Sequence, residues 1–348
     1  MTAYCRRALA ALTAPLLAVL LAAAPVSAQE VTLTIHHFLG PKATTQAKFI
    51  EPWAKRVEEA SGGRIAFKIF PAMSLGGKPP ELYRQVRDGV ADIVWTLPGY
   101  TPGVFPRVEV FELPGIHQGS ARQTTLALQD VMPDLAEDFA EVHPLLVHTH
   151  AGNALHIVSE RVASEGDLVG LKLRTPSRTG AWMIESWGAE PVGMPVPALP
   201  EALSKNVVDG ALVPFEIVPP LKLQELTETS LEGPEGLRFG TSIFLFAMNK
   251  ERYEGLPEDL RAVLDAHSGA AIAEEFGAVW DAVEAPGKAL QTGSAGGAVE
   301  TLSPAVYDAL MAKSTTAISR WVAEMEEAGV DGEALVSKAR AAMAAHAE

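Results

Sequence analysis

The chain has 348 residues, a single cysteine and a formal net charge of −15 at pH 7. This length is sufficient for two domains, each with its own hydrophobic core. The acidic balance argues against nucleic acids and anionic membrane surfaces as partners, because both repel a negatively charged protein. An anionic small-molecule ligand would therefore need a local cationic anchor.

The first 28 residues have the pattern of a secretory signal peptide. Arg6 and Arg7 precede an apolar run that ends near Ala24, and small residues up to Ala28 provide a cleavage site. The run is short for a membrane anchor, so we expect an exported, soluble chain in the periplasm without stable membrane insertion. Because Cys5 lies within the signal, the mature protein would contain no disulfide bond.

Strands and helices are predicted to alternate through the first part of the mature chain. Period-2 patterns and a largely apolar run predict strands, and helical spacing of apolar residues predicts the segments between them. The expected elements are strands over 31–35, 65–70 and 91–97 and helices over 44–60 and 79–87. This alternation predicts an α/β sheet covered by helices on both faces.

The same order of elements recurs further along the chain. A helix is expected over 200–206 and a strand over 210–214, and Val207-Val208-Asp209 before that strand repeats Val90-Ala91-Asp92. The repeat is short, but together with the similar order of elements it predicts two α/β lobes of like design. Two such lobes create a cleft between them, which is the usual place for a small-molecule site.

Helical patterns dominate the C-terminal part. One continues over 256–283, before Pro286-Gly287, and its length of about 40 Å predicts a helix that spans both lobes. Helices over 304–328 and 332–347 are expected after a glycine-rich turn. The predicted division of the mature chain is lobe I over 29–151 plus 241–280 and lobe II over 152–240 plus 281–348.

Arg174 is the most informative candidate for ligand binding. It occurs in the segment 170–176, where leucines alternate with charged residues as in a half-buried strand, and Ser177 or Thr179 would cap the following helix. Arg174 would then lie at the carboxyl end of a strand, where ligands bind in open α/β sheets. A guanidinium there can hold a carboxylate by two parallel charged hydrogen bonds. The alternative for a lone arginine is a solvated surface position.

Six short segments occur in a characteristic order and spacing: Ser61-Gly62-Gly63-Arg64-Ile65, Leu75-Gly76-Gly77, Asp88-Gly89-Val90-Ala91-Asp92, Gly170 to Pro176, Val208-Asp209-Gly210 and Leu256-Pro257-Glu258-Asp259-Leu260. With them the whole mature chain resembles the periplasmic solute-binding subunits of tripartite ATP-independent periplasmic (TRAP) transporters, the DctP-like family. The resemblance implies a two-lobed periplasmic binding protein (Venus-flytrap) fold of the α/β class that closes on an organic acid. It implies that Arg174 binds the ligand carboxylate. It also implies delivery of the ligand to membrane permease subunits that an ion gradient drives.

Two places differ from the sialic-acid-binding members of that family. Val213 stands where those proteins have an asparagine that assists the carboxylate, and Trp95, Leu97 and Tyr100 stand where they use charged residues. Both differences make the pocket less polar. We therefore expect a carboxylate ligand with a compact, partly apolar or aromatic body rather than a sialic acid.

Further candidates for ligand binding lie near the ends of predicted strands. The complete expected set is Arg174, Trp95, Tyr100, His37, Phe38, Asn153, His156, Phe215 and Glu216. Aromatic rings in this set could enclose a flat ligand, with plain core packing as the alternative. His37 or His156, together with Asn153, could donate hydrogen bonds to the carboxylate, whereas Glu216 would repel it unless it is protonated.

The sequence contains none of the common catalytic motifs, and we expect no cofactor. His148, His150 and His156 could begin a zinc site, but no carboxylate or cysteine is spaced to complete one. We predict a monomeric binding protein without enzymatic activity. Two alternatives stay open: a binding protein that serves an ATP-driven (ABC) importer or a sensor histidine kinase, and a periplasmic metalloenzyme that uses these three histidines.

Overall fold

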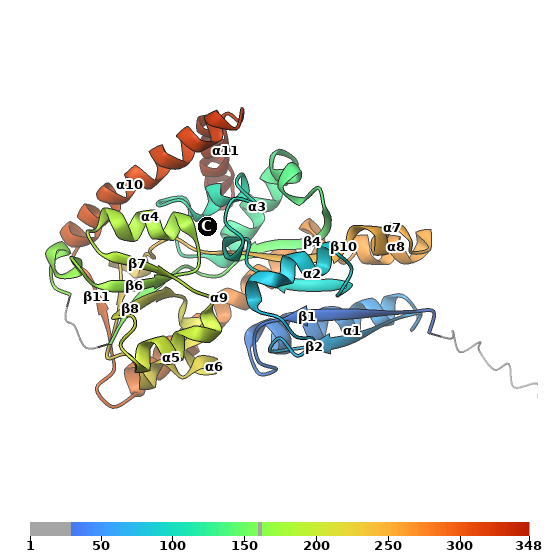
Figure 1. Ribbon diagram of the computed structural model, residues 1–348, viewed down its shortest axis with the longest axis horizontal. Coiled ribbons are helices and arrows are strands. Elements are labelled where there is room, and N and C mark those ends of the chain that lie inside the picture. Colours follow the sequence, from blue (N-terminus) through green and yellow to red (C-terminus); the bar gives the residue numbers. More distant parts are fainter. Residues whose placement is uncertain (1–28, 159–161, 348) are drawn as a thin grey trace, which may run out of the picture.

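The computed structural model describes residues 29–158 and 162–347, which fold around two mixed β-sheets (Figure 1). The predicted signal peptide lies outside the described residues. The strands of the first sheet are β1 (Val31–His37), β2 (Ile65–Phe70), β3 (Ile93–Thr96), β4 (Val142–Thr149) and β10 (Ile243–Asn249). They lie in the order β2-β1-β3-β10-β4, in which β10 runs antiparallel to both of its neighbours.

The second sheet is built from shorter strands. They are β5 (Ala154–Ile157), β6 (Lys172–Thr175), β7 (Glu190–Gly193), β8 (Gly210–Val213), β9 (Thr229–Glu232) and β11 (Ala298–Thr301). Their order is β11-β9-β5-β8-β6-β7, with β6, β7 and β8 parallel to one another and β5 antiparallel to β8 and β9. Two separate mixed sheets in a chain rich in helices confirm the predicted two-lobed α/β fold class.

The two sheets share one local feature. Asp92 precedes β3, and its carboxylate accepts a hydrogen bond from the backbone N–H of Thr34 on the neighbouring strand β1 (2.8 Å). Asp209 precedes β8, and its carboxylate accepts from the backbone N–H of Lys172 on the neighbouring strand β6 (2.8 Å). The repeated Val-x-Asp pattern therefore marks equivalent positions in two lobes of like design.

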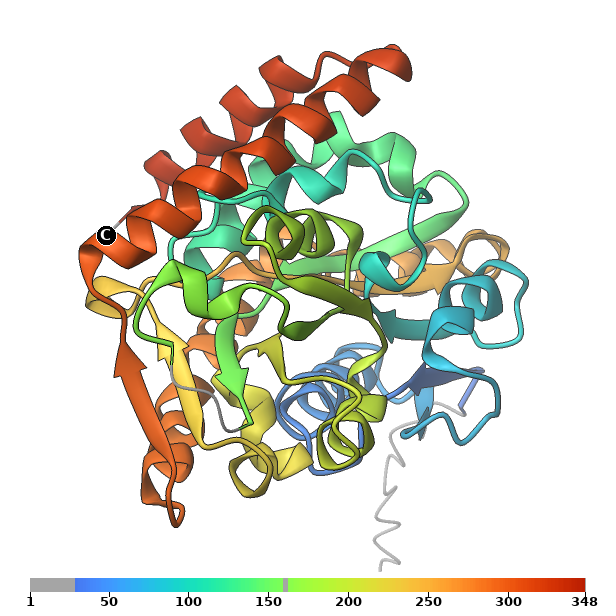
Figure 2. The ribbon, with the colours of Figure 1, turned by 60° about the vertical axis from the view of Figure 1, so that its left-hand side comes forward.

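Helices cover both sheets (Figures 1 and 2). They are α1 (Glu51–Ala60), α2 (Leu82–Arg87), α3 (Ala121–Leu135), α4 (Arg178–Ser186), α5 (Leu199–Ser204), α6 (Val218–Leu221), α7 (Lys250–Glu254), α8 (Glu258–Asp265), α9 (Ala270–Gly293), α10 (Pro304–Glu327) and α11 (Gly332–Ala345). The helix expected over 44–60 is a π-helix, η1 (Thr45–Ile50), that continues directly into α1. Within the described part of the chain, no helix combines the length and the apolar character that a bilayer span requires.

The long C-terminal helix begins and ends later than the sequence predicted. The expected helix over 256–283 is interrupted between α8 and α9, where Gly269 has a φ of +54° and donates its N–H to the carbonyl of Leu145 (2.7 Å). At the other end, α9 continues through Pro286 to Gly293. Directly after this proline, Gly287 lies so close to the backbone of Phe215 that a side chain at position 287 would collide with it, so only glycine permits this contact.

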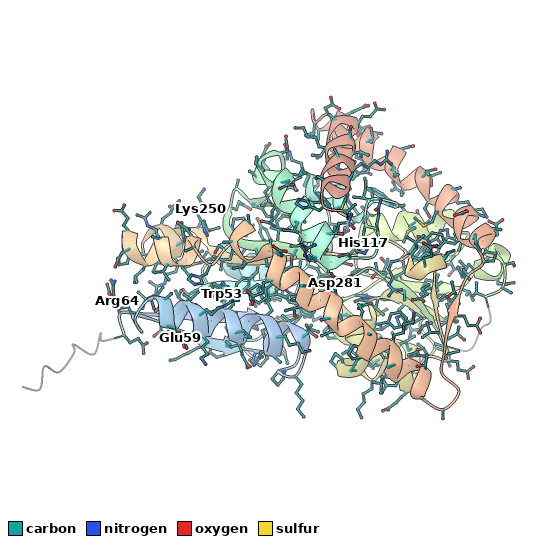
Figure 3. All side chains as sticks on the ribbon, turned by 180° about the vertical axis from the view of Figure 1, so that it is seen from behind. Trp53, Glu59, Arg64, His117, Lys250 and Asp281 are labelled. Carbon is teal, nitrogen blue, oxygen red and sulfur yellow. The ribbon has the colours of Figure 1, made fainter. Side chains whose placement is uncertain are left out.

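Helix α9 contacts elements of both sheets, as expected for a helix that spans both lobes (Figure 3). Near its middle, the Asp281 carboxylate accepts hydrogen bonds from the hydroxyl of Ser120 (3.0 Å) and the N–H of Ala121 (2.6 Å) at the start of α3. One turn later, the Glu284 carboxylate accepts from the N–H of Glu216 (2.9 Å) in the 3-10 helix η8 (Phe215–Ile217). The exact lobe boundaries stay a prediction, and α11 packs against α3 rather than against the second sheet.

Candidate ligand-binding site

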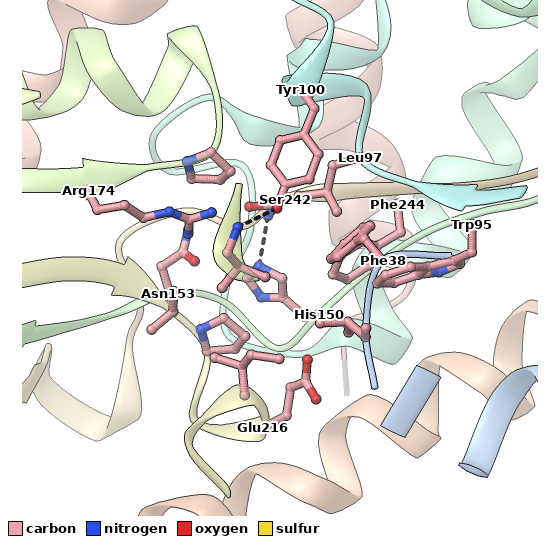
Figure 4. A pocket seen from close by; sticks show the side chains of 16 residues that line it. Phe38, Trp95, Leu97, Tyr100, His150, Asn153, Arg174, Glu216, Ser242 and Phe244 are labelled. Carbon is pink, nitrogen blue, oxygen red and sulfur yellow. Dashed lines mark hydrogen bonds between the residues drawn. The ribbon is translucent and has the colours of Figure 1, made fainter. Parts of the chain in front are cut away.

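A cavity lies between the two sheets, where the ends of their strands converge (Figure 4). On the side of the first sheet, its apolar lining is formed by Phe38, Leu39, Trp95, Leu97, Tyr100 and Phe244. On the side of the second sheet, it is formed by Pro176, Val196, Val213, Pro214 and Ile217. The polar lining residues are His150, Asn153, Arg174, Glu216 and Ser242.

Two segments that connect the sheets pass beside this cavity. Asn153 lies between β4 and β5, and its N–H donates to the carbonyl of Gly240 (2.8 Å), which lies between β9 and β10. The hydroxyl of Thr241 donates to the carbonyl of His150 (2.9 Å). Paired connections of this kind are typical positions for a hinge, since a few residues there can absorb the rotation of one lobe against the other.

Arg174 lies on β6 with 2% of its surface exposed and reaches the cavity. Its Nε donates to the carbonyl of Met194 (3.0 Å), and its Nη1 donates to the carbonyl of Leu212 (3.3 Å). Among the described residues, its Nη2 has no acceptor in hydrogen-bonding geometry and no carboxylate pairs with it, so the Tyr100 hydroxyl is the side chain that favours its charged form. A buried, uncompensated guanidinium is costly, so an anionic group in the cavity would complete its hydrogen bonding and offset its charge.

Tyr100 closes the cavity between the two sheets. Its hydroxyl accepts a hydrogen bond from the N–H of Val196 (2.9 Å), which follows β7 of the second sheet. Burial raises the pKa of Tyr100, and the positive charge of Arg174 works in the opposite direction. The adjacent Gly99 lies so close to Ser177 that a Cβ at position 99 would lie 2.8 Å from the Cβ of that serine. The segment after β3 and the segment after β6 are therefore in direct contact beside the cavity.

Aromatic rings form one wall of the cavity. The ring of Trp95 stacks on Phe244 with centroids 4.5 Å apart and lies 5.0 Å from the ring of Phe38. Phe38 in turn lies 5.5 Å from the ring of Tyr100. The indole N–H of Trp95 donates to His148 (3.0 Å), so its polar edge is satisfied within the core. The wall is suited to a flat apolar ligand body.

Glu216 contributes a buried carboxyl group to the same cavity. Burial, and then the negative charge of Glu284, raise the pKa of Glu216 to about 8, while the hydroxyl of Thr44 works in the opposite direction. Its Oε2 has no hydrogen-bond partner among the described residues. At neutral pH the group is therefore mainly protonated, which removes the repulsion that an ionised Glu216 would exert on an anionic ligand.

The structure does not bring His37 and His156 to the cavity. His37 is fully buried, and its ring pairs with the side chain of Gln46 (3.0 Å). His156 pairs with the hydroxyl of Ser230 (2.7 Å) within the second sheet. The histidine that lines the cavity is instead His150, which the sequence indicated only as a candidate metal ligand. Side-chain direction at a strand end depends on the strand's neighbours, which period-2 reasoning does not specify.

Phe215 also lies outside the cavity lining. Its ring contacts the imidazole of His156 (5.2 Å between centroids) and the guanidinium of Arg238 (5.1 Å from the ring centroid). Conversely, sequence reasoning missed Ser242 and Phe244. Ser242 directly precedes β10 and Phe244 lies at its start, and the antiparallel pairing of β10 with β3 joins segments that lie far apart in the chain, so no local motif marks these two residues.

The three histidines considered as zinc ligands have separate surroundings. Burial lowers the pKa of His148 to about 3 and that of His156 to about 4, and it lowers the pKa of His150 as well. Within residues 29–158 and 162–347, no group of three or more His, Cys, Asp or Glu side chains is arranged to hold a metal ion.

The family model of bacterial extracellular solute-binding proteins, family 7 (DctP), matches residues 35–325. A TRAP solute-binding protein from a marine metagenome, specific for aromatic acid ligands, is 42% identical, with 92% of this chain and 100% of that chain covered and a TM-score of 0.88. Its crystal structures contain meta-hydroxyphenylacetate and 3-hydroxybenzoate. A TRAP solute-binding protein from Rhodoferax ferrireducens with copurified benzoate is 39% identical, with 91% of this chain and 98% of that chain covered and a TM-score of 0.87.

A more distant TRAP solute-binding protein from Bordetella bronchiseptica, with both enantiomers of mandelate bound, is 26% identical. The similarity covers 90% of this chain and 99% of that chain, with a TM-score of 0.83. These matches extend over both sheets and the cavity between them. The chain belongs to family 7 of the bacterial extracellular solute-binding proteins, and it is a solute-binding protein of the TRAP transporter type.

Proposed function

We propose that this protein captures an aromatic monocarboxylate in the periplasm and delivers it to the permease subunits of a TRAP transporter. The observation that carries the proposal is the buried guanidinium of Arg174, which lines an aromatic-walled cavity with one nitrogen unpartnered. A ligand carboxylate supplies the missing acceptor and the missing negative charge. The bound aromatic acids of the similar proteins support the same ligand class.

Capture proceeds in two stages. In an open form, Arg174 attracts the carboxylate, and rotation at the paired connections near Asn153 and Gly240 then brings the aromatic wall over the ligand. Closure excludes water, so the ion pair strengthens in a less polar environment. Burying about 150 Å² of ligand carbon contributes on the order of 4 kcal/mol at about 25 cal/mol per Å². The hydrogen bond between Tyr100 and Val196 holds the closed form.

We propose that the protein acts as a monomer and as a binding protein rather than an enzyme, and the second point is supported by the family of solute-binding proteins to which the chain belongs. Delivery to an ion-driven permease distinguishes it from the binding proteins of ABC importers and from sensor kinase ligand domains. Neighbouring genes for small and large permease subunits would support this assignment, and a neighbouring ATP-binding subunit would contradict it.

A calorimetric panel tests the ligand class. We expect micromolar or tighter binding of benzoate and phenylacetate, much weaker binding of cyclohexanecarboxylate, and no binding of benzyl alcohol, which lacks the charge that Arg174 requires. Native mass spectrometry of the purified protein should find a small aromatic acid if one is retained. Tight binding of a sialic acid, or no binding of any aromatic acid, would overturn the proposal.

A further inference from the structure

The surroundings of the Glu216 carboxyl group are not explained by the capture of a ligand carboxylate alone. The residue is 5% exposed, it lies on η8 directly after β8, and it lines the cavity. Its Oε2 is buried without a hydrogen-bond partner among the described residues. Buried polar atoms are almost always paired in folded proteins, so an unpaired one that faces a ligand cavity points to a partner on the ligand.

Glu216 and Arg174 enter the cavity from different elements and different directions (Figure 4). Arg174 extends from β6, whereas Glu216 lies on η8, and both line the same cavity. A ligand whose carboxylate contacts Arg174 therefore presents a different part of its body to Glu216. The cavity has two polar contact points and an aromatic wall.

The charge balance around Glu216 decides which kind of group it can contact. The titratable and charged groups that face it are Glu284 on α9 and, across the cavity, His150 and Arg174. Burial raises the pKa of Glu284 to about 7, below that of Glu216, because the guanidinium of Arg238 at 3.5 Å and two backbone N–H groups that donate to Glu284 work against the rise. Because Oε2 of Glu216 lacks such donors, Glu216 takes the proton of the pair. A protonated carboxyl group can both donate and accept a hydrogen bond.

We propose that Glu216 recognises a hydroxyl group of the ligand, so that the preferred solute is a hydroxylated aromatic monocarboxylate. A hydroxyl group matches a neutral carboxyl because each can donate to and accept from the other. A second ligand carboxylate does not match, because it would lie near the negative charge of Glu284 and could not donate a hydrogen bond to Glu216. This inference rests on the proposed function and adds the residue that discriminates among aromatic acids.

The test compares benzoate with its 2-, 3- and 4-hydroxy derivatives and with isophthalate, by calorimetry at pH 7. The wild-type protein should bind at least one hydroxybenzoate 10-fold or more tightly than benzoate, and isophthalate more weakly than either. Glu216→Leu should reduce the ratio between that hydroxybenzoate and benzoate to nearly one. Glu216→Gln, which keeps a donor and an acceptor, should retain most of the preference. Glu228→Gln, at an exposed carboxylate in the same half of the molecule, should behave like the wild type.

A pH series provides a second measurement that does not depend on the leucine variant. Between pH 7 and pH 9, the wild-type affinity for the hydroxybenzoate should fall severalfold as Glu216 ionises, and Glu216→Gln should show little change. If benzoate binds but neither its ratio to the hydroxybenzoates nor the pH profile depends on position 216, the inference is wrong while the proposed function stands. If no aromatic acid binds, the proposed function itself fails.

Discussion

The phenolic oxygen of Tyr100 accepts a hydrogen bond from the backbone N–H of Val196 at 2.9 Å, and this bond joins the segment after β3 to the segment after β7. Both residues also line the cavity. The bond therefore connects the two sheets at the same place where the ligand would be enclosed. Ligand affinity and lobe closure should depend on it together.

Tyr100→Phe keeps the aromatic ring and removes the acceptor of this hydrogen bond. Loss of one such bond, at about 1 kcal/mol, should weaken ligand binding about 5-fold, mainly through faster dissociation. Stopped-flow fluorescence and calorimetry measure both quantities. Tyr83→Phe is the matched control, because the Tyr83 hydroxyl donates to Glu141 away from the cavity. An unchanged dissociation rate in Tyr100→Phe would show that the bond does not hold the closed form.

Arg174→Ala should weaken the binding of aromatic carboxylates at least 100-fold, because the cavity loses its cationic partner for the carboxylate. Arg174→Lys should recover only part of the affinity, since an ammonium group keeps the charge but loses the planar pair of donors. The unliganded Arg174→Ala protein should be no less stable than the wild type in thermal unfolding, as it no longer buries an uncompensated charge. Arg64→Ala, which removes an arginine that is paired with Glu30 at the surface, serves as the control and should leave affinity unchanged.

Gly99→Ala tests how closely the lobes must approach. A Cβ at position 99 would lie 2.8 Å from the Cβ of Ser177 and 3.2 Å from the carbonyl of Pro176, so the methyl group should oppose closure. We expect at least a 10-fold loss of affinity and a smaller ligand-induced rise in melting temperature. Gly293→Ala adds a methyl group where no atom lies within 4 Å and should leave both unchanged. If Gly99→Ala binds the ligand as tightly as the wild type, the closed form does not require the close contact between Gly99 and Ser177.

Glu216 should also make the stability of the unliganded protein depend on pH. Its pKa is raised from 4.5 to about 8 in the folded protein, mainly by burial. Below about pH 4.5 both states bind the proton, and between about pH 4.5 and pH 8 only the folded state does, so this carboxyl group lowers stability progressively as the pH rises through that range. The melting temperature of the wild type should therefore fall relative to that of Glu216→Gln up to about pH 8. Parallel curves for the two proteins would contradict the raised pKa.

Local sequence patterns were sufficient to predict most of the helices and strands. The strand that carries Arg174 and the helix that Ser177 caps follow from alternation and capping chemistry, and both form where they were expected. The long helix was placed wrongly at both ends. It is interrupted at Gly269, whose N–H donates to Leu145 on β4, and it continues through Pro286, after which Gly287 packs closely against Phe215. Neither contact is local in the sequence.

The prediction of the cavity lining was limited in the same way, by contacts that are not local in the sequence. The sequence indicated Arg174, Trp95, Tyr100, Phe38, Asn153 and Glu216, which line the cavity because each follows or ends a strand at the converging edges of the sheets. It could not place His150 at the cavity in preference to His37 or His156, because the direction of a side chain depends on which strands flank it.

The sequence by itself predicted the two-lobed α/β architecture, Arg174 as the candidate cationic anchor and an apolar wall, because periodicity and residue chemistry are encoded locally. Only the tertiary structure leaves the Arg174 guanidinium without a carboxylate partner among the described residues and raises the pKa of the Glu216 carboxyl group by burial. Both properties arise from burial and from neighbours contributed by distant segments. Electrostatic interactions depend on distances in space, and sequence separation does not specify those distances.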